Sequence, residues 1–220
     1  MGFFESLKDN CADEWRAYTR HEFVLQLGAA TLPKPAFQTY LVQDYLFLIQ
    51  FARAHALAVY KSTNLQDMRD AAAGVSAILD VEMDLHVRLC ADWGLSAADL
   101  EHSVEAPQTI AYTRFVLEAG HAGDILDLMV ALAPCMLGYA EIGRWLVAEH
   151  GKPEANHPYQ TWINEYAGQA YQDVAQATLL TLEKHASELL TQGRQNRLFH
   201  LFSQATRLEA EFWQMGLTSV

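Results

Sequence analysis

The chain has 220 residues, 51% of them hydrophobic, and a formal net charge of −12. This length and apolar content suit one large core, so a single domain over residues 1–220 is expected. The negative charge repels phosphates, and Lys and Arg form no cluster, which argues against binding to nucleic acid or to an anionic membrane.

Neither the N-terminal region nor the stretch Phe37–Tyr60 is expected to be a targeting or membrane-spanning segment. Charged residues such as Glu5 and Lys8 occupy the N-terminal region, which is therefore expected to be mature protein. The stretch Phe37–Tyr60 is expected to be the most apolar of the chain, but it contains Asp44 and Arg53, so we predict a buried core helix. A soluble, cytoplasmic protein is the resulting expectation.

Apolar residues recur at helical spacing along nearly the whole chain, and no alternating β-branched run indicates a sheet. Gly94 ends one helix, Ser96 and Asp99 resemble a capping box that starts the next, and an interruption is expected near Gly168. The predicted fold is therefore an all-α, antiparallel-rich bundle. Its predicted helices include a first one with the stripe Phe4, Leu7, Cys11, Trp15 and Tyr18, a third one after Pro33-Lys34-Pro35, and others over about 66–93, 107–119, 125–150 (after a turn at 120–123), 159–191 and 195–216.

Two carboxylates interrupt apolar helical faces. Asp44 shares its face with aromatic and small residues from Phe37 to Ala58. Glu209 likewise follows Phe202 at helical spacing, whereas its neighbour Glu211 falls on a polar face. Because an unpaired buried carboxylate is costly, both inward groups are candidates for partnered or mechanistic roles.

Two histidines have structural explanations that compete with ligand roles. His86 lies four residues after Glu82, so we expect it to pair with Glu82 or Asp84 more readily than with a metal. His21 is expected to occupy a helix junction.

Cys135 differs in its setting from the other two cysteines. All three lack CxxC or zinc-type spacing, so disulfides and a structural zinc site are not predicted, and Cys11 and Cys90 are expected to be core residues. Cys135 lies on an inward stripe directly after Pro134, which interrupts the helical hydrogen-bond ladder. With Asp44, Glu209 and the aromatic residues Tyr112, Tyr139 and Tyr166, this thiol is predicted to line one pocket.

A di-iron site requires Glu-x-x-His pairs on facing helices. The two matching strings are Glu118 to His121, which is expected to run through a glycine turn, and Glu154 to His157, which lies between two prolines. Neither is expected to present both ligands on a continuous helix, so no metal site is predicted.

Four sequence blocks together form one pattern, namely Trp15-x-x-Tyr18-x-x-His21, Tyr40 to Leu48 with Phe51 to Ala54, Pro134 to Gly143, and Leu208 to Trp213. In this combination and order they resemble the TenA/thiaminase II family over nearly the whole chain. The resemblance implies a haem-oxygenase-like all-α fold, a homotetramer, a small-molecule aminopyrimidine substrate and no haem, metal or other cofactor.

The resemblance also implies a reaction in thiamin salvage. Cys135 would attack C6 of the pyrimidine, and water would replace the substituent on the exocyclic methylene, giving hydroxymethylpyrimidine from the aminomethyl compound or from thiamin. Glu209 would bond ring N1 and Asp44 the 4-amino group. The implied substrate contacts are Phe47, His86, Tyr112, Tyr139, Tyr166 and Phe212.

One position departs from the family pattern, because many members carry Tyr where this chain has Phe47. Ring stacking survives this change, and a hydroxyl hydrogen bond is lost. A non-catalytic pyrimidine-binding protein is therefore kept as an alternative. A haem or metal oxygenase with His21 or His86 as ligand is a further alternative, for which the chain shows no complete ligand set.

Overall fold

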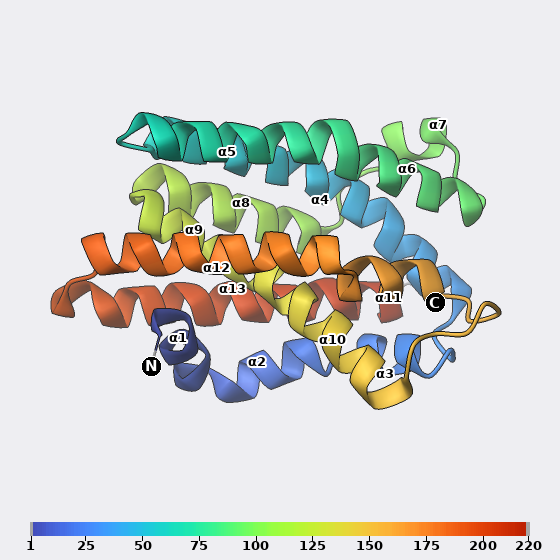
Figure 1. The fold of residues 1–220 in the computed structure, drawn as a ribbon. Coiled ribbons are helices and arrows are strands. Elements are labelled where there is room, and N and C mark those ends of the chain that lie inside the picture. Colours follow the sequence, from blue (N-terminus) through green and yellow to red (C-terminus); the bar gives the residue numbers. More distant parts are fainter. Residues whose placement is uncertain (1, 219–220) are drawn as a thin grey trace. The chain divides into compact units, whose positions relative to one another are not determined.

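The computed structural model describes residues 2–218, which contain helices and no strand (Figure 1). The predicted all-α class is therefore confirmed. The chain forms two compact units, each built from separate segments: unit 1 comprises Met1–Leu32 and Met129–Gln214, and unit 2 comprises Pro33–Leu128 and Met215–Val220. Each unit is described by itself below.

Unit 1 begins with α1 (Phe3–Asn10), α2 (Ala12–Thr19) and α3 (Glu22–Gly28). A single first helix was expected, but the backbone leaves the helical region at Cys11 (φ −135°, ψ 43°), whose N–H bonds the Lys8 carbonyl in a tighter turn. The predicted stripe from Phe4 to Tyr18 is nevertheless buried throughout. The break therefore redirects the chain and keeps the same side chains in the core.

The N-terminus of α1 is held by a carboxylate from α12. Both oxygens of Glu183 accept backbone hydrogens, from Phe3 at 2.8 Å and from Phe4 at 2.9 Å. These N–H groups lack helical partners, and a negative charge there also complements the helix dipole. A side chain at Gly2 would meet Glu183 at 2.8 Å, so glycine leaves room for this cap.

The remaining helices of unit 1 confirm most predicted boundaries. The expected break at Gly168 is present, since its backbone is extended (φ −66°, ψ 149°) between two helices. α9 and α13 also contribute residues to unit 2. The elements are α9 (Ile125–Ala133), the π-helical turn η2 (Pro134–Gly138), α10 (Tyr139–His150), α11 (Gln160–Ala167), α12 (Gln169–Leu189) and α13 (Gln192–Thr218).

One run among the described residues, Ile125–His150, is long and apolar enough to cross a membrane by composition. Of its most apolar window, 83% is buried inside the protein, as in the core helix of a soluble protein. The expectation that Phe37–Tyr60 is the most membrane-like segment is therefore wrong, because its polar residues lower its hydropathy below that of α9 and α10.

In unit 2, α5, the π turn η1 and α6 follow one another along the top of Figure 1 and pack against α4. They cover the predicted helix 66–93, which ends as expected at Gly94 (φ +80°), and the Ser96–Asp99 capping box is present. The elements of this unit are α4 (Lys34–Lys61), α5 (Leu65–Ala77), η1 (Ile78–Glu82), α6 (Met83–Asp92), α7 (Ala97–Glu101) and α8 (Pro107–Ala122).

The predicted turn from Gly120 to Gly123 is wrong in its first part, because α8 continues to Ala122. A side chain at Gly120 would approach Leu57 to 2.6 Å. Glycine at this position therefore allows close packing of α8 on α4 and does not mark a turn.

Candidate functional site

The predicted site residues form one group in each unit. The thiol cluster of unit 1 comprises Cys135, Tyr139, Tyr166, Glu209 and Phe212. The carboxyl cluster of unit 2 comprises Asp44, Phe47, His86 and Tyr112. Every member is buried except Tyr166, which is half-buried. The inward orientation predicted for Asp44 and Glu209 is confirmed, and Glu211 is exposed as expected.

The thiol lies on the π-helical turn η2, directly after Pro134. Proline has no amide hydrogen and clashes with the preceding turn, which explains why the helix widens there. The interruption predicted at Pro134 is thus confirmed. Tyrosine hydroxyls bond two carbonyls of this turn, Tyr18 to Pro134 at 3.2 Å and Tyr171 to Met136 at 3.4 Å. The turn that presents Cys135 is therefore fixed from outside the helix.

The Tyr18 phenol interacts electrostatically with both Glu209 and Cys135. Burial raises the pKa of this fully buried phenol well above its usual value, and Glu209 and then Cys135 raise it further. The sequence placed Tyr18 on a core stripe without a site role, although its spacing from Trp15 was part of the family pattern.

Two glycines allow this close arrangement. A Cβ at Gly138 would overlap the Tyr18 ring and lie 2.7 Å from its hydroxyl oxygen. A Cβ at Gly143 would lie 2.6 Å from the Ala167 nitrogen, so this glycine lets α11 approach α10. Any other residue at either position would displace a tyrosine of the site.

Aromatic rings form a wall beside the thiol. The ring centroids of Tyr139 and Tyr166 lie 4.9 Å apart, Tyr166 lies 4.5 Å from Trp162, and Tyr139 lies 5.2 Å from Trp213. Phe212 is 2% exposed and follows Glu209 by nearly one helical turn. Such a wall suits a flat, partly apolar ligand.

In unit 2, Asp44 lies between two partners on different helices. The Tyr40 hydroxyl donates to Oδ2 of Asp44 at 3.3 Å, and Nδ1 of His86 lies 3.4 Å from the same oxygen. Nε2 of His86 bonds the Leu41 carbonyl at 2.8 Å. The expectation that His86 pairs with Glu82 or Asp84 is wrong, because both of its ring nitrogens face α4.

Burial controls the charge of this pair. Desolvation raises the pKa of Asp44 to about 7, against the opposing effect of the Tyr40 hydrogen bond. Desolvation lowers the pKa of His86, against the opposing effect of its bond to Leu41. A carboxyl group that titrates near neutral pH is typical of functional sites.

Phe47 and Tyr112 provide the aromatic surface of the carboxyl cluster. Their rings are stacked, with centroids 5.3 Å apart and an interplanar angle of 23°. Gln43 fixes the start of α8, since its Oε1 accepts from the Ala106 N–H at 2.8 Å and from the Thr109 hydroxyl at 2.7 Å. α8 in turn carries Tyr112, so the sequence around Asp44 also positions the tyrosine.

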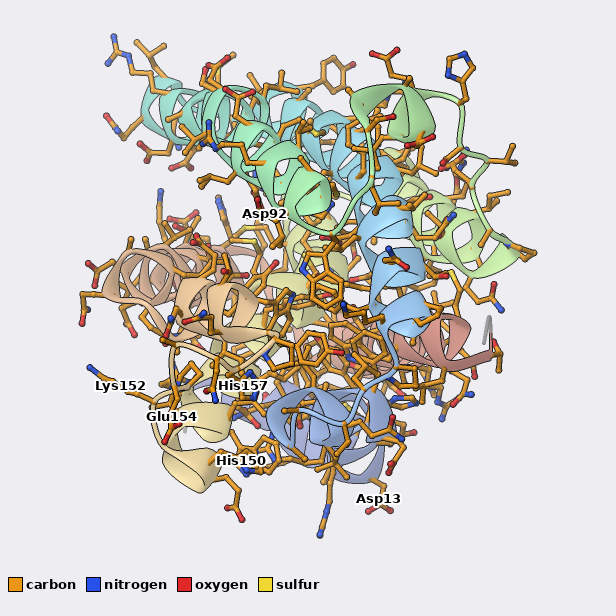
Figure 2. The ribbon with its side chains drawn as sticks, turned by 90° about the vertical axis from the view of Figure 1, so that its right-hand side faces the viewer. Asp13, Asp92, His150, Lys152, Glu154 and His157 are labelled. Carbon is orange, nitrogen blue, oxygen red and sulfur yellow. The ribbon has the colours of Figure 1, made fainter. Side chains whose placement is uncertain are left out.

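The histidines considered as metal ligands have structural roles or lie on the surface. Among residues 2–218, no three His, Cys, Asp or Glu side chains gather into a group that could hold a metal ion. His21 caps α3 by accepting the Phe23 N–H, which confirms its expected place at a junction. Figure 2 shows His157 and Glu154 on the loop after α10, where Nε2 of His157 bonds the Gly28 carbonyl at 3.3 Å.

Glu118 and His121 both lie on the continuous helix α8, so the expectation that a glycine turn separates them is wrong. Gly120, between them, is helical. Their side chains are exposed, and they belong to no cluster of potential metal ligands among the described residues.

Unit 1 also has a surface hollow of about 790 Å³ beside α2 and α10. Within it, the Arg20 guanidinium lies 4.4 Å from the Trp145 ring centroid, and Glu141 accepts from the Trp15 indole at 3.1 Å. The hollow contains no member of the thiol cluster.

A buried thiol and a buried carboxyl group around one tyrosine, beside an aromatic wall, form a site typical of nucleophilic catalysis in an all-α protein. Residues 8–219 match the TENA/THI-4/PQQC family, and the chain belongs to this family. The family resemblance is thereby confirmed.

Relatives of known structure or name share nearly the whole chain. An aminopyrimidine aminohydrolase from Halalkalibacterium halodurans is 38% identical over 98% of this chain and 96% of its own length. The structure of a TenA family transcription regulator from Silicibacter sp. TM1040 is 45% identical, with a TM-score of 0.93 over 98% of this chain and 96% of its own. A Shewanella denitrificans domain with a haem-oxygenase-like fold has a TM-score of 0.76 at 11% identity, covering 98% of this chain and 92% of its own, which confirms the expected fold.

Proposed function

We propose that this protein is a hydrolase of thiamin salvage that cleaves the C–N bond at the exocyclic methylene of an aminopyrimidine. Its substrates are 4-amino-5-aminomethyl-2-methylpyrimidine and thiamin, and its product is the 5-hydroxymethyl compound. The observation that carries the proposal is the position of Cys135 on the π turn η2, where Cys135 and Glu209 both interact electrostatically with Tyr18. The similarity to the aminopyrimidine aminohydrolase from Halalkalibacterium halodurans supports the same reaction.

The proposed reaction has two substitution steps. The Cys135 sulfur adds to C6, the ring electrons move towards N1, and Glu209 stabilises the proton that N1 gains. The electron pair then returns and breaks the C–N bond at the methylene group, and the amine takes a proton as it leaves. Water adds to the methylene carbon and releases a proton in exchange. The ring finally loses the N1 proton and expels the sulfur from C6, which restores the thiol and the aromatic ring.

The other cluster members hold the ring. Asp44 accepts a hydrogen bond from the 4-amino group, and Phe47 packs on the ring face. Tyr112 and Tyr139 position the ring and the thiol, while Tyr166 and Phe212 pack against the substrate. The stacking of Phe47 on Tyr112 and the tilted contact of Tyr139 with Tyr166 support these positions.

The test is a substrate panel with product detection by mass spectrometry, run on the wild type and on Cys135→Ser. Loss of the nucleophile should reduce turnover by about a thousand-fold or more. Cys11→Ser is the matched control, because Cys11 is buried in unit 1 and lies outside the thiol cluster. Wild-type turnover by Cys135→Ser would show that another group is the nucleophile.

A second candidate function is pyrimidine binding without turnover. Phe47 favours it, since this ring lacks the hydroxyl that many family members place there. Calorimetry would then show tight binding of the aminopyrimidine while the panel shows no product. DNA binding, which a regulator requires, is disfavoured by the net charge of −12.

We further propose a cytoplasmic homotetramer. Exposed apolar side chains on η1 and α6 of unit 2 support self-association. They include Leu79, Val81 and Leu85, which are 50%, 56% and 42% exposed. Three cysteines without a disulfide among the described residues suit a reducing compartment. Light scattering after size exclusion should give four times the 24.7 kDa chain mass. A monomer would contradict this assembly, and cell fractionation tests the compartment.

A further inference from the structure

The two carboxyl oxygens of Asp44 differ in their surroundings. Oδ2 accepts from Tyr40 and faces Nδ1 of His86. Oδ1 makes no hydrogen bond to any residue in the described range 2–218, although the Asp44 side chain is only 9% exposed. Oδ1 is not fully buried, because the fully buried side-chain atoms without a partner among the described residues are Nε2 of His55 and Nε1 of Trp213. An accessible carboxyl oxygen without a protein donor can accept a hydrogen bond from a ligand.

The bond between His86 and Leu41 fixes the tautomer of the imidazole. A backbone carbonyl can only accept, so Nε2 carries a hydrogen in the 2.8 Å contact with Leu41. In the neutral ring Nδ1 is therefore an acceptor, aimed at Oδ2 of Asp44. A proton shared by the pair then lies either on Oδ2 or on Nδ1. Oδ1 carries no hydrogen in either case.

The neighbouring groups favour one shared proton. Tyr40 faces Asp44 from the same helix, and the Cys90 thiol on α6 lies close enough for Asp44 to raise its pKa, which burial brings to about 12. The Cys90 thiol is therefore neutral at physiological pH. Burial disfavours an ionised Asp44 beside a neutral His86, because that state leaves one uncompensated charge.

We propose that His86 is a positioning residue that holds the Asp44 proton on Oδ2 and thereby makes Oδ1 an acceptor-only atom that selects 4-aminopyrimidines over 4-oxopyrimidines. The inference rests on the proposed function and deepens it. An amino group donates to Oδ1, whereas an oxo group places a second acceptor against it. The substrate contact predicted for His86 is thus replaced by an action through Asp44.

Removing Nδ1 should weaken the selection. In His86→Leu, burial still favours a protonated Asp44, but the proton is free to occupy Oδ1 and to donate to an oxo group. In Asp44→Asn, by contrast, the amide NH₂ should turn to Nδ1 of His86, which leaves the amide oxygen as an acceptor. Asp44→Asn should therefore keep the preference for the amino group over the oxo group. A purely structural role of His86 does not predict this result.

Calorimetry with the full-length protein tests the inference, using 4-amino-5-hydroxymethyl-2-methylpyrimidine and its 4-oxo counterpart as probes. The wild type should bind the amino probe at least about 100-fold more tightly, because an oxo group covers the acceptor Oδ1 without donating to it. This ratio should fall to about 10-fold or less in His86→Leu and in the double variant His86→Leu/Asp44→Asn, whose amide is free to turn either way. It should stay near the wild-type value in Asp44→Asn and in the exposed control His121→Gln.

An unchanged ratio in folded His86→Leu, or a lost ratio in Asp44→Asn, would overturn the inference. If His86→Leu does not fold, the binding ratio measured with Asp44→Asn still tests the inference, because a lost ratio would overturn it. A wild type that hydrolyses aminopyrimidines without preferring the amino probe would also overturn it. If the wild type neither binds nor hydrolyses them, the proposed function itself fails, which the hydrolysis panel shows separately.

Discussion

At the scale of a residue, the most consequential feature is a carboxyl group whose burial raises its pKa from 3.8 to about 7. Between these two values the folded chain keeps a proton that the unfolded chain releases, so Asp44 lowers stability as pH rises through this window. Asn cannot ionise. We predict that Asp44→Asn is more stable than the wild type by about 2–4 kcal/mol at pH 8, and that this gain disappears towards pH 4.

Thermal unfolding of both proteins from pH 4 to pH 8 measures this difference. Asp84→Asn, an exposed change on the neighbouring turn of α6, is the matched control and should show no such trend. A gap between Asp44→Asn and the wild type that stays constant with pH would contradict the titration assigned to Asp44.

Periodicity predicted which residues point inward, but not which partners they meet. Asp44 and Glu209 were placed correctly because one residue on an apolar face is visible in the sequence alone. His86 was paired with Glu82 because four residues along a helix are the nearest sequence neighbours. Its actual partners on α4 depend on the packing of α6, which local spacing does not encode.

At the scale of an element, the π turn η2 depends on Gly138. A side chain there would overlap Tyr18, which has little room to move because it is fully buried and stacked near Trp213 at 6.4 Å. We predict that Gly138→Ala costs about 1–3 kcal/mol through overpacking. It should lower Tm by about 2–10 °C and reduce turnover, because Tyr18 holds the turn that carries Cys135.

Gly193→Ala is the matched control, since it lies in α13 with open space around its Cα. Alanine has the higher helix propensity, so this change should be neutral or slightly stabilising. Calorimetry and a turnover assay on both variants separate the steric effect from the general effect of replacing a glycine. Equal Tm values for the two variants would contradict the role assigned to Gly138.

The elements that sequence predicted best were those bounded by strong local signals. Gly94, the Ser96–Asp99 box and Gly168 all marked real boundaries. The break at Cys11 was missed because the apolar stripe continues across it and no proline or glycine marks the turn. The widening at Pro134 was anticipated as a distortion, since proline removes a hydrogen bond wherever it lies in a helix.

At the scale of the whole molecule, the proposed single domain has a measurable consequence. The chain passes between its two units after Leu32, after Leu128 and after Gln214, and two of these crossings fall inside the continuous helices α9 and α13. Unfolding one unit alone would therefore break helical hydrogen bonds inside both helices. We predict one cooperative transition, with equal calorimetric and van't Hoff enthalpies.

Variants placed in each unit provide a sharper form of this test. Gly138→Ala lies in unit 1, and Gly120→Ala, which would crowd Leu57, lies in unit 2. If the chain unfolds as one domain, each variant shifts the entire transition. If the units unfold independently, each variant moves only part of the signal, and two steps appear. Scans at two protein concentrations separate this result from subunit dissociation, because only dissociation depends on concentration.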